Sequence, residues 1–139
     1  MGLVASDDQP LLGLLSMILP CIASGNRVVA VPSLKAALIV ADFYQLLDTS
    51  DVPGGVINLV TGVPSELATV LAAHDDVAAI WAVGPVDECE QIKKESAGNL
   101  KSVWTSDGKS PDWYDSQAEG SSWLERATQV KNIWVPYGE

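Results

Sequence analysis

The chain has 139 residues, of which 47% are hydrophobic, and a net charge of −10 at neutral pH. This length and apolar content predict one domain with a real core and exclude an intrinsically disordered chain. The acidic charge argues against nucleic acid and anionic membranes as partners, because both require clustered Lys or Arg. One histidine and two cysteines are too few for a structural zinc site, so we expect no metal.

The first residues, the longest apolar run and the two cysteines lead us to expect a cytoplasmic protein. The first residues, MGLVASDDQ, lack the positive region of a signal peptide, and the apolar run at 11–22 is shorter than the about 18 residues of a membrane span. Cys21 lies within this apolar run and is expected to be an inert core thiol. Cys89 lies between Glu88 and Glu90, which disfavour a thiolate.

Apolar helices and apolar strands alternate along the first 105 residues. Residues 11–22 are apolar on most faces, which predicts a buried helix that Pro20 should kink or end early. The apolar run at 28–31 has no alternation and predicts a strand covered on both faces. The next predicted elements are a helix at 36–47, a strand at 55–60, a helix at 65–73, a strand at 77–83, a helix at 87–97 and a strand at 100–105.

This alternation predicts an α/β fold with a Rossmann-like, mostly parallel sheet that carries helices on both faces. The pattern breaks after Pro111, where DWYDSQAEGSS predicts a polar linker or surface loop. The segment VKNIWV at 130–135 has apolar residues on both sides and predicts a terminal strand. Such a strand requires a sheet edge, either in its own domain or in a partner chain.

Few residues suggest chemistry on their own. The turn at Thr61–Ser65 lies between a predicted strand and a predicted helix, a place where anions bind. Pro64 removes one amide donor, so a structural turn is favoured over a phosphate site. His74 ends a predicted helix, and the pairs Asp7–Asp8 and Asp75–Asp76 are better explained as helix-end charges than as acid and base.

The order of the segments resembles the cofactor domain of aldehyde dehydrogenases. The motifs that carry the resemblance are PLLGLLSMILPCIASGNRVVAVPS, LLDTSDVPGGVINLVTG, HDDVAAIWAVGP and SDGKSP, and the closing ATQVKNIWVPYGE is similar to the C-terminal oligomerisation strand of the same superfamily. A short bridge stands where the family has its catalytic domain. This layout, with LLDTSDVPGG and SAGNLKSVW, resembles the degenerate C-terminal unit of aldehyde dehydrogenase family 16.

The resemblance implies three parts and a site that lacks its functional groups. The parts are a cofactor-type Rossmann-like domain at 1–111, a bridge at 112–125 and a C-terminal oligomerisation strand at 126–139. Asp8 stands where the family has an asparagine that stabilises an oxyanion, and an ionised carboxylate would repel one. Thr105 stands in place of the general-base glutamate, and a threonine hydroxyl is no base at neutral pH.

The cofactor positions differ from the family in the same way. Val31 and Leu34 replace the lysine and the glutamate that hold the cofactor ribose, and neither can bond a hydroxyl. In Ala82–Pro85, which resembles the loop against the nicotinamide and the pyrophosphate, only Gly84 is kept. The nucleophilic cysteine belongs to the missing domain, and neither Cys21 nor Cys89 matches it. The turn Gly108-Lys109-Ser110-Pro111 is kept as a fold element.

These departures predict a chain without catalytic, cofactor-binding or metal-binding residues. The expected function is that of a non-catalytic aldehyde-dehydrogenase-like domain with a structural, oligomerisation or scaffolding role. The expected partner is a second copy or an aldehyde dehydrogenase unit, joined through the C-terminal strand. Two alternatives stay open: a segment of an NAD-dependent aldehyde dehydrogenase whose active site lies elsewhere in the polypeptide, and a protein-binding module that uses a sheet edge.

Overall fold

The computed structural model describes residues 1–130, 132–135 and 137, and its centre is a five-stranded parallel sheet. The strands lie in the order β3-β2-β1-β4-β5. β1 pairs on one side with β2, where Leu3 faces Ala30, and on the other with β4, where Leu3 faces Trp81. The bounds are β1 Gly2–Val4, β2 Val28–Val31, β3 Ile57–Leu59, β4 Ala79–Ala82 and β5 Ser102–Thr105. The predicted α/β fold with a parallel sheet is confirmed.

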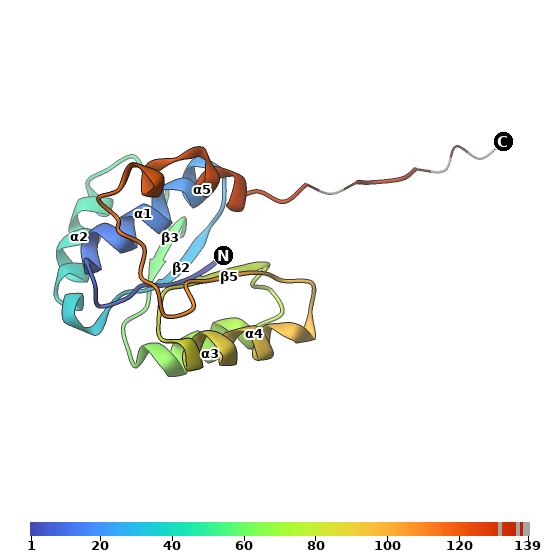
Figure 1. Ribbon diagram of the computed structural model, residues 1–139. Coiled ribbons are helices and arrows are strands. Elements are labelled where there is room, and N and C mark those ends of the chain that lie inside the picture. Colours follow the sequence, from blue (N-terminus) through green and yellow to red (C-terminus); the bar gives the residue numbers. More distant parts are fainter. Residues whose placement is uncertain (131, 136, 138–139) are drawn as a thin grey trace.

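Helices cover both faces of this sheet, as the apolar strands require. α3 and α4 lie on one face, and α1, α2 and α5 lie on the other (Figure 1). Successive strand residues point to opposite faces, so Leu3 belongs to the core under α1, whereas Val4 belongs to the core under α3 and α4. The helix bounds are α1 Pro10–Ala23, α2 Ile39–Asp48, α3 Pro64–Ala73, α4 Val86–Glu95 and α5 Ser121–Arg126.

The central strand was missing from the sequence-based prediction. Gly2–Val4 forms β1, and all three residues are buried. The apolar run at this point is only a few residues long, too short to indicate a strand without its neighbours. Its parallel pairing with both β2 and β4 is a long-range property that no local pattern carries.

Two helix predictions need correction. α1 continues through Pro20 to Ala23, because the proline removes only the one N–H that would bond the carbonyl of Ser16, and only three residues of the helix follow it. The Pro20 carbonyl still accepts the Ser24 amide at 3.1 Å. The helix predicted at 36–47 is instead a short 3₁₀ turn at Leu34–Ala36 followed by α2.

The segment after Pro111 is part of the core. Trp113 is 2% exposed and Trp123 is 7% exposed, so the prediction of a surface loop is wrong at Trp113. The two rings lie 5.3 Å apart between centroids, and Trp123 also meets Trp81 and Trp104 edge to face. The guanidinium of Arg126 lies 5.6 Å from the Trp104 ring. The bridge therefore closes the sheet face that α1 leaves open beside β4 and β5.

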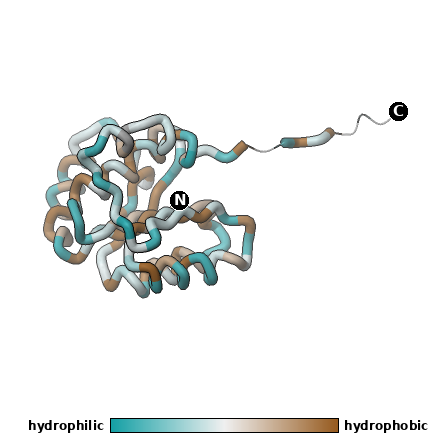
Figure 2. Tube along the Cα trace, in the orientation of Figure 1, coloured by the Kyte–Doolittle hydropathy of each residue, from teal (hydrophilic) through white to brown (hydrophobic). Residues whose placement is uncertain are grey.

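The last residues leave the body of the protein. Arg126 ends α5, and the structure assigns neither helix nor strand to the described residues after it. This tail, residues 128–130, 132–135 and 137, runs outward (Figures 1 and 2), and its apolar residues Val130, Ile133 and Trp134 are exposed. The oligomerisation strand predicted at 126–139 starts inside a helix in this structure, and its pairing with a partner stays a prediction. Among the described residues, no helix has the length and apolar content to cross a membrane.

Candidate functional site

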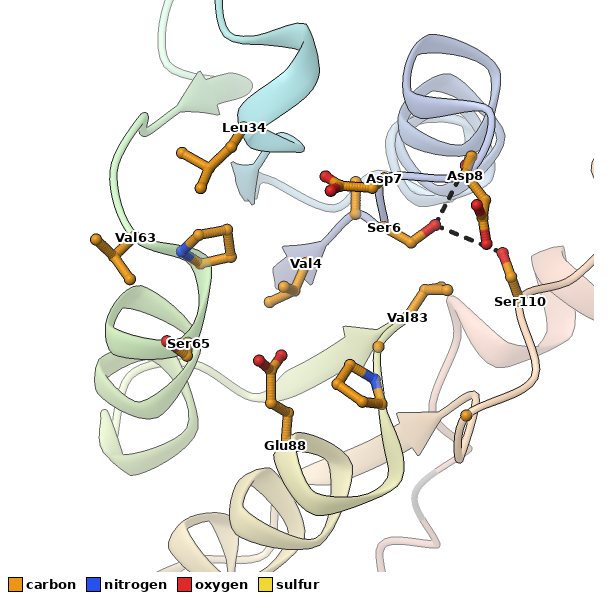
Figure 3. A pocket seen from close by; sticks show the side chains of 15 residues that line it. Val4, Ser6, Asp7, Asp8, Leu34, Val63, Ser65, Val83, Glu88 and Ser110 are labelled. Atoms are coloured by element: carbon orange, nitrogen blue, oxygen red, sulfur yellow. Dashed lines mark hydrogen bonds between the residues drawn. The ribbon is translucent and has the colours of Figure 1, made fainter.

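A crevice of about 510 Å³ opens at the carboxyl ends of the strands. It lies where the strand order reverses between β1 and β4, which is where open α/β sheets bind their ligands. Its walls come from the segments that follow β1 and β4, the start of α3 and the turn after β5 (Figure 3). The lining residues are Val4–Asp8, Leu34, Val63–Ser65, Val83–Pro85, Glu88, Gly108 and Ser110.

The structure brings together most of the positions singled out in the sequence. Asp8, Leu34, Gly84, Pro85 and Ser110 all line the crevice, although they come from four different segments. The hydroxyl of Ser6 contacts the Ser110 hydroxyl at 3.5 Å and donates to the Asp8 carbonyl at 3.2 Å (Figure 3). The retained turn therefore joins the loop after β1 across the mouth of the crevice.

Other singled-out residues lie elsewhere. Val31 is buried in β2, and Lys109 and Pro111 belong to the turn without lining the crevice. Thr105 ends β5, and its hydroxyl donates to the Asp107 carboxylate at 2.8 Å. The same carboxylate oxygen accepts Lys93 Nζ at 2.6 Å, and these two bonds, that of Lys93 first, lower the pKa of Asp107.

The cysteines and the histidine do not line the crevice. Cys21 is fully buried in α1, and burial raises the pKa of its thiol to about 12. Cys89 is fully buried in α4, and its thiol donates to the Gly84 carbonyl at 3.5 Å, behind the crevice wall. His74 caps the end of α3. The described residues hold no cluster of His, Cys, Asp or Glu arranged for a metal ion.

Glu88 is a lining residue that the sequence analysis did not single out. It lies in the first turn of α4, and its carboxylate points into the crevice between Val4 and Ser65 (Figure 3). A side-chain carbon on Gly84 would lie 3.3 Å from its Oε2 atom. Its spacing from Gly84 was the available signal. Glu88 lies four residues after Gly84, in the first turn of α4, and therefore near the N-terminal end of this helix. Its negative charge occupies the place where a helix N-terminus favours an anion.

Asp7 joins two loops on the opposite side of the crevice. Its carboxylate accepts the Ser33 hydroxyl, and it lies 3.4 Å from Lys35 Nζ. These contacts, that of Ser33 first, lower the pKa of Asp7 below its usual range. Ser33 is almost fully buried just after β2, so the contact ties the loop after β1 to the turn that carries Leu34.

The aldehyde dehydrogenase family model matches residues 1–128, which is nearly the whole chain. The chain belongs to the aldehyde dehydrogenase family. It is 36% identical over 102 residues to the 2-aminomuconic semialdehyde dehydrogenase of Mus musculus, a match that covers 73% of this chain and 21% of that protein. The similarity confirms the superfamily expected from the motifs.

Solved structures of the family share the fold. The aldehyde dehydrogenase of Bartonella henselae superposes with a TM-score of 0.72 at 29% identity, over 77% of this chain and 22% of that one. The indole-3-acetaldehyde dehydrogenase of P. syringae, solved in complex with NAD⁺, has a TM-score of 0.71 at 27% identity, over 77% and 22% of the two chains. This aldehyde dehydrogenase family chain thus spans about a fifth of the length of the relatives it matches.

The bond between Ser33 and Asp7 predicts a pH effect in this family member. Because the pKa of Asp7 is lower in the folded protein than in the unfolded chain, its stabilising effect is present above the unfolded value. The effect is lost as the pH falls through the folded value. We expect Ser33→Ala to raise the pKa of Asp7, measured by NMR titration of the carboxyl carbon. Ser50→Ala, which removes a hydroxyl bonded to Leu47, is the control. An unchanged pKa in Ser33→Ala would contradict the assignment.

Proposed function

We propose that this chain is a non-catalytic aldehyde-dehydrogenase-like unit that assembles subunits or supports an active unit elsewhere. The observation that carries the proposal is the chemistry of the crevice. Three carboxylates line it, those of Asp7, Asp8 and Glu88, and among the described lining residues none is Lys or Arg. Lys35 offsets the charge of Asp7, but it stands outside the lining.

Such a lining does not suit a dinucleotide. The pyrophosphate of NAD carries negative charge and binds at helix N-termini through backbone N–H groups. At the start of α4, Pro85 has no N–H to offer, and the Glu88 carboxylate stands in the first turn. Like charges at such short range repel, most strongly where the crevice excludes water. Leu34, on the opposite wall, offers no group for a ribose hydroxyl.

The residues at the positions of the family's chemical step do not suit that chemistry either. Asp8 offers a carboxylate where an oxyanion requires a donor. The Thr105 hydroxyl is committed to Asp107, and Asp107 is itself held by Lys93. The Asp8 carboxylate therefore supplies no oxyanion donor, and the Thr105 hydroxyl supplies no general base in the crevice.

A structural role also accounts for the tail. Val130, Ile133 and Trp134 are each more than four-fifths exposed, which is costly for apolar side chains in a lone chain. The alternating segment VKNIWV supports the proposal of a pairing strand within 126–139, joined to 1–111 by the bridge at 112–125. The short bridge and the motifs LLDTSDVPGG and SAGNLKSVW support the narrower proposal of a unit like the degenerate one of aldehyde dehydrogenase family 16. A cytoplasmic location is part of the same proposal.

The first test is NAD binding. We expect no saturable heat when NAD is titrated to millimolar concentration into the chain in a calorimeter, because the crevice repels the pyrophosphate. The P. syringae relative solved with NAD⁺ serves as the positive control. A dissociation constant below about 1 mM, which corresponds to about −4 kcal/mol, would contradict the proposal. It would favour the second candidate, a segment of an NAD-dependent aldehyde dehydrogenase. This candidate is supported by the coverage, since the chain matches only about a fifth of the relatives' length.

The second test is the oligomeric state. Deleting residues 128–139 should turn an oligomer into a monomer or an aggregate, as measured by size-exclusion chromatography with light scattering. A chain in which these residues are replaced by a Gly/Ser segment of equal length controls for hydrodynamic size. If the intact chain and the deletion are both monomers, the assembly role is wrong.

A further inference from the structure

The turn after β5 contains Asp107 followed by Gly108, the only Asp–Gly or Asn–Gly pair in the chain. Such a pair is prone to a reaction of its own, because glycine has no side chain to hinder attack by its backbone nitrogen. The φ angle is 49° at Asp107 and 80° at Gly108, and only glycine adopts positive φ without cost. The Asp107 side chain is 54% exposed, so water reaches its carboxylate.

The reaction converts Asp107 to isoaspartate in two steps and needs no reagent besides water. The backbone nitrogen of Gly108 loses its proton to the solvent and attacks Cγ of the protonated Asp107 carboxyl group. A C–N bond forms, the C–OH bond breaks and the oxygen leaves as water, which gives a cyclic imide. Water then opens the imide at either carbonyl. One opening restores aspartate, and the other gives isoaspartate, in which the main chain runs through Cγ.

Three contacts oppose this reaction in the folded protein. Oδ1 of Asp107 accepts Lys93 Nζ at 2.6 Å and the Thr105 hydroxyl at 2.8 Å. Both bonds favour the ionised carboxylate, whose oxygen is a poor leaving group. The Gly108 N–H donates to the Gly84 carbonyl at 3.0 Å, so the attacking nitrogen is engaged as well. The rate of imide formation should therefore depend on Lys93, which lies on α4, as well as on the turn.

From this arrangement we infer that Asp107 is a modification site, where isoaspartate forms spontaneously at a rate that the Lys93 contact sets. Lys93 is the residue that distinguishes this turn from the same sequence in an unfolded chain, because it comes from a separate element and lies 14 residues away. Its side chain is 47% exposed, so the contact opens without disturbing the core. The reaction is independent of the function proposed above.

The product changes the wall of the crevice. Isoaspartate lengthens the main chain by one carbon inside a closely packed turn, since a side-chain carbon on Gly108 would already lie 2.9 Å from Val86 Cγ2. The Ser106 hydroxyl, one residue before the site, accepts the Gly84 N–H at 3.1 Å. The longer chain should break the contacts of the turn with Gly84 and displace Gly108 from the crevice lining.

The test is ageing of the full chain in neutral buffer at body temperature. Isoaspartate is quantified by methyl transfer from a protein isoaspartyl methyltransferase and located by mass-spectrometric peptide mapping. In the wild-type chain we expect Asp107 to be the first aspartate that is converted. In Lys93→Ala the rate at Asp107 should rise about twofold to fivefold, the effect of losing an ion pair between exposed side chains. Lys93→Arg keeps a cation at this position and should restore the slow rate.

Two more variants separate the Lys93 contact from other causes. Lys94→Ala is the matched control, because Lys94 is the next residue of α4 and forms no ion pair with any described residue. It should age at the wild-type rate. Thr105→Val removes the second bond to Oδ1 without altering α4 and should also raise the rate. Equal rates in Lys93→Ala and the wild type would overturn the role of Lys93. Conversion mainly at another aspartate would overturn the site.

Discussion

Trp123→Ala is expected to lower the free energy of unfolding by about 3–5 kcal/mol, the range found when large aromatic side chains are removed from cores. The ring is 7% exposed and meets three other tryptophans, with centroid distances of 5.3 Å to Trp81, 4.9 Å to Trp104 and 5.3 Å to Trp113. Through these ring contacts, Trp123 packs the bridge against β4 and β5. Urea denaturation followed by circular dichroism measures the loss.

The matched control for Trp123 is Tyr114→Ala in the same segment. Tyr114 is 77% exposed, so its removal should change stability by no more than about 0.5 kcal/mol. If Trp123→Ala costs as little as Tyr114→Ala, the bridge is not a core element. Near-ultraviolet circular dichroism gives a second readout, since the edge-to-face pairs around Trp123 should lose their signal together.

Gly13→Ala is expected to destabilise the protein by about 1–3 kcal/mol, the usual cost of overpacking a well-filled core. This reverses the ordinary effect of the change, because alanine in a helix is about 1 kcal/mol better than glycine. A side-chain carbon on Gly13 would lie 2.7 Å from Trp113 Nε1 and 3.1 Å from its Cδ1. Glycine is therefore needed in α1 so that the bridge can approach. Thermal and urea denaturation measure the effect.

Two further variants test whether close contact with Trp113 causes the loss of stability in Gly13→Ala. Gly98→Ala is the control, because nothing lies within 4 Å of the new carbon there. Trp113 Nε1 is buried and has no hydrogen-bond partner in the structure, so Trp113→Phe removes no bond. The double variant Gly13→Ala/Trp113→Phe should recover part of the loss, since a smaller ring relieves the close contact. A stabilising Gly13→Ala would show that the bridge packs differently.

The sequence predicted the two strands that flank β1 better than β1 itself. The strands at 28–31 and 77–83 are continuous apolar runs, and such runs indicate burial on both faces without further information. β1 was missed because three residues carry no periodicity, and its place between β2 and β4 depends on two long-range pairings. The packing of Trp113 against Gly13 is likewise a contact between distant segments, which composition cannot indicate.

The candidate site could be predicted in part for a physical reason. The carboxyl ends of parallel strands meet at one edge of a sheet, which brings Gly84 and Ser110, each in a segment after a predicted strand, to the same crevice. Asp8 follows β1, which was not predicted, so only the family resemblance pointed to its place in the site. Glu88 was not expected, since its direction depends on the phase of α4 relative to Pro85. Thr105 ended outside the lining because Asp107, with a positive φ of 49°, turns back to bond its hydroxyl.

The position of β1 has a consequence for how the protein is made. The middle strand of the sheet leaves the ribosome first, yet one of its two neighbours, β4, is synthesised only after β2, α2, β3 and α3. β1 can therefore complete its ladder only late in translation, and until then the backbone N–H and C=O groups along its β4 edge stay unpaired. Cotranslational acquisition of the native sheet should thus occur in one late step, and nascent chains that end before Ala82 should bind chaperones that recognise exposed apolar segments.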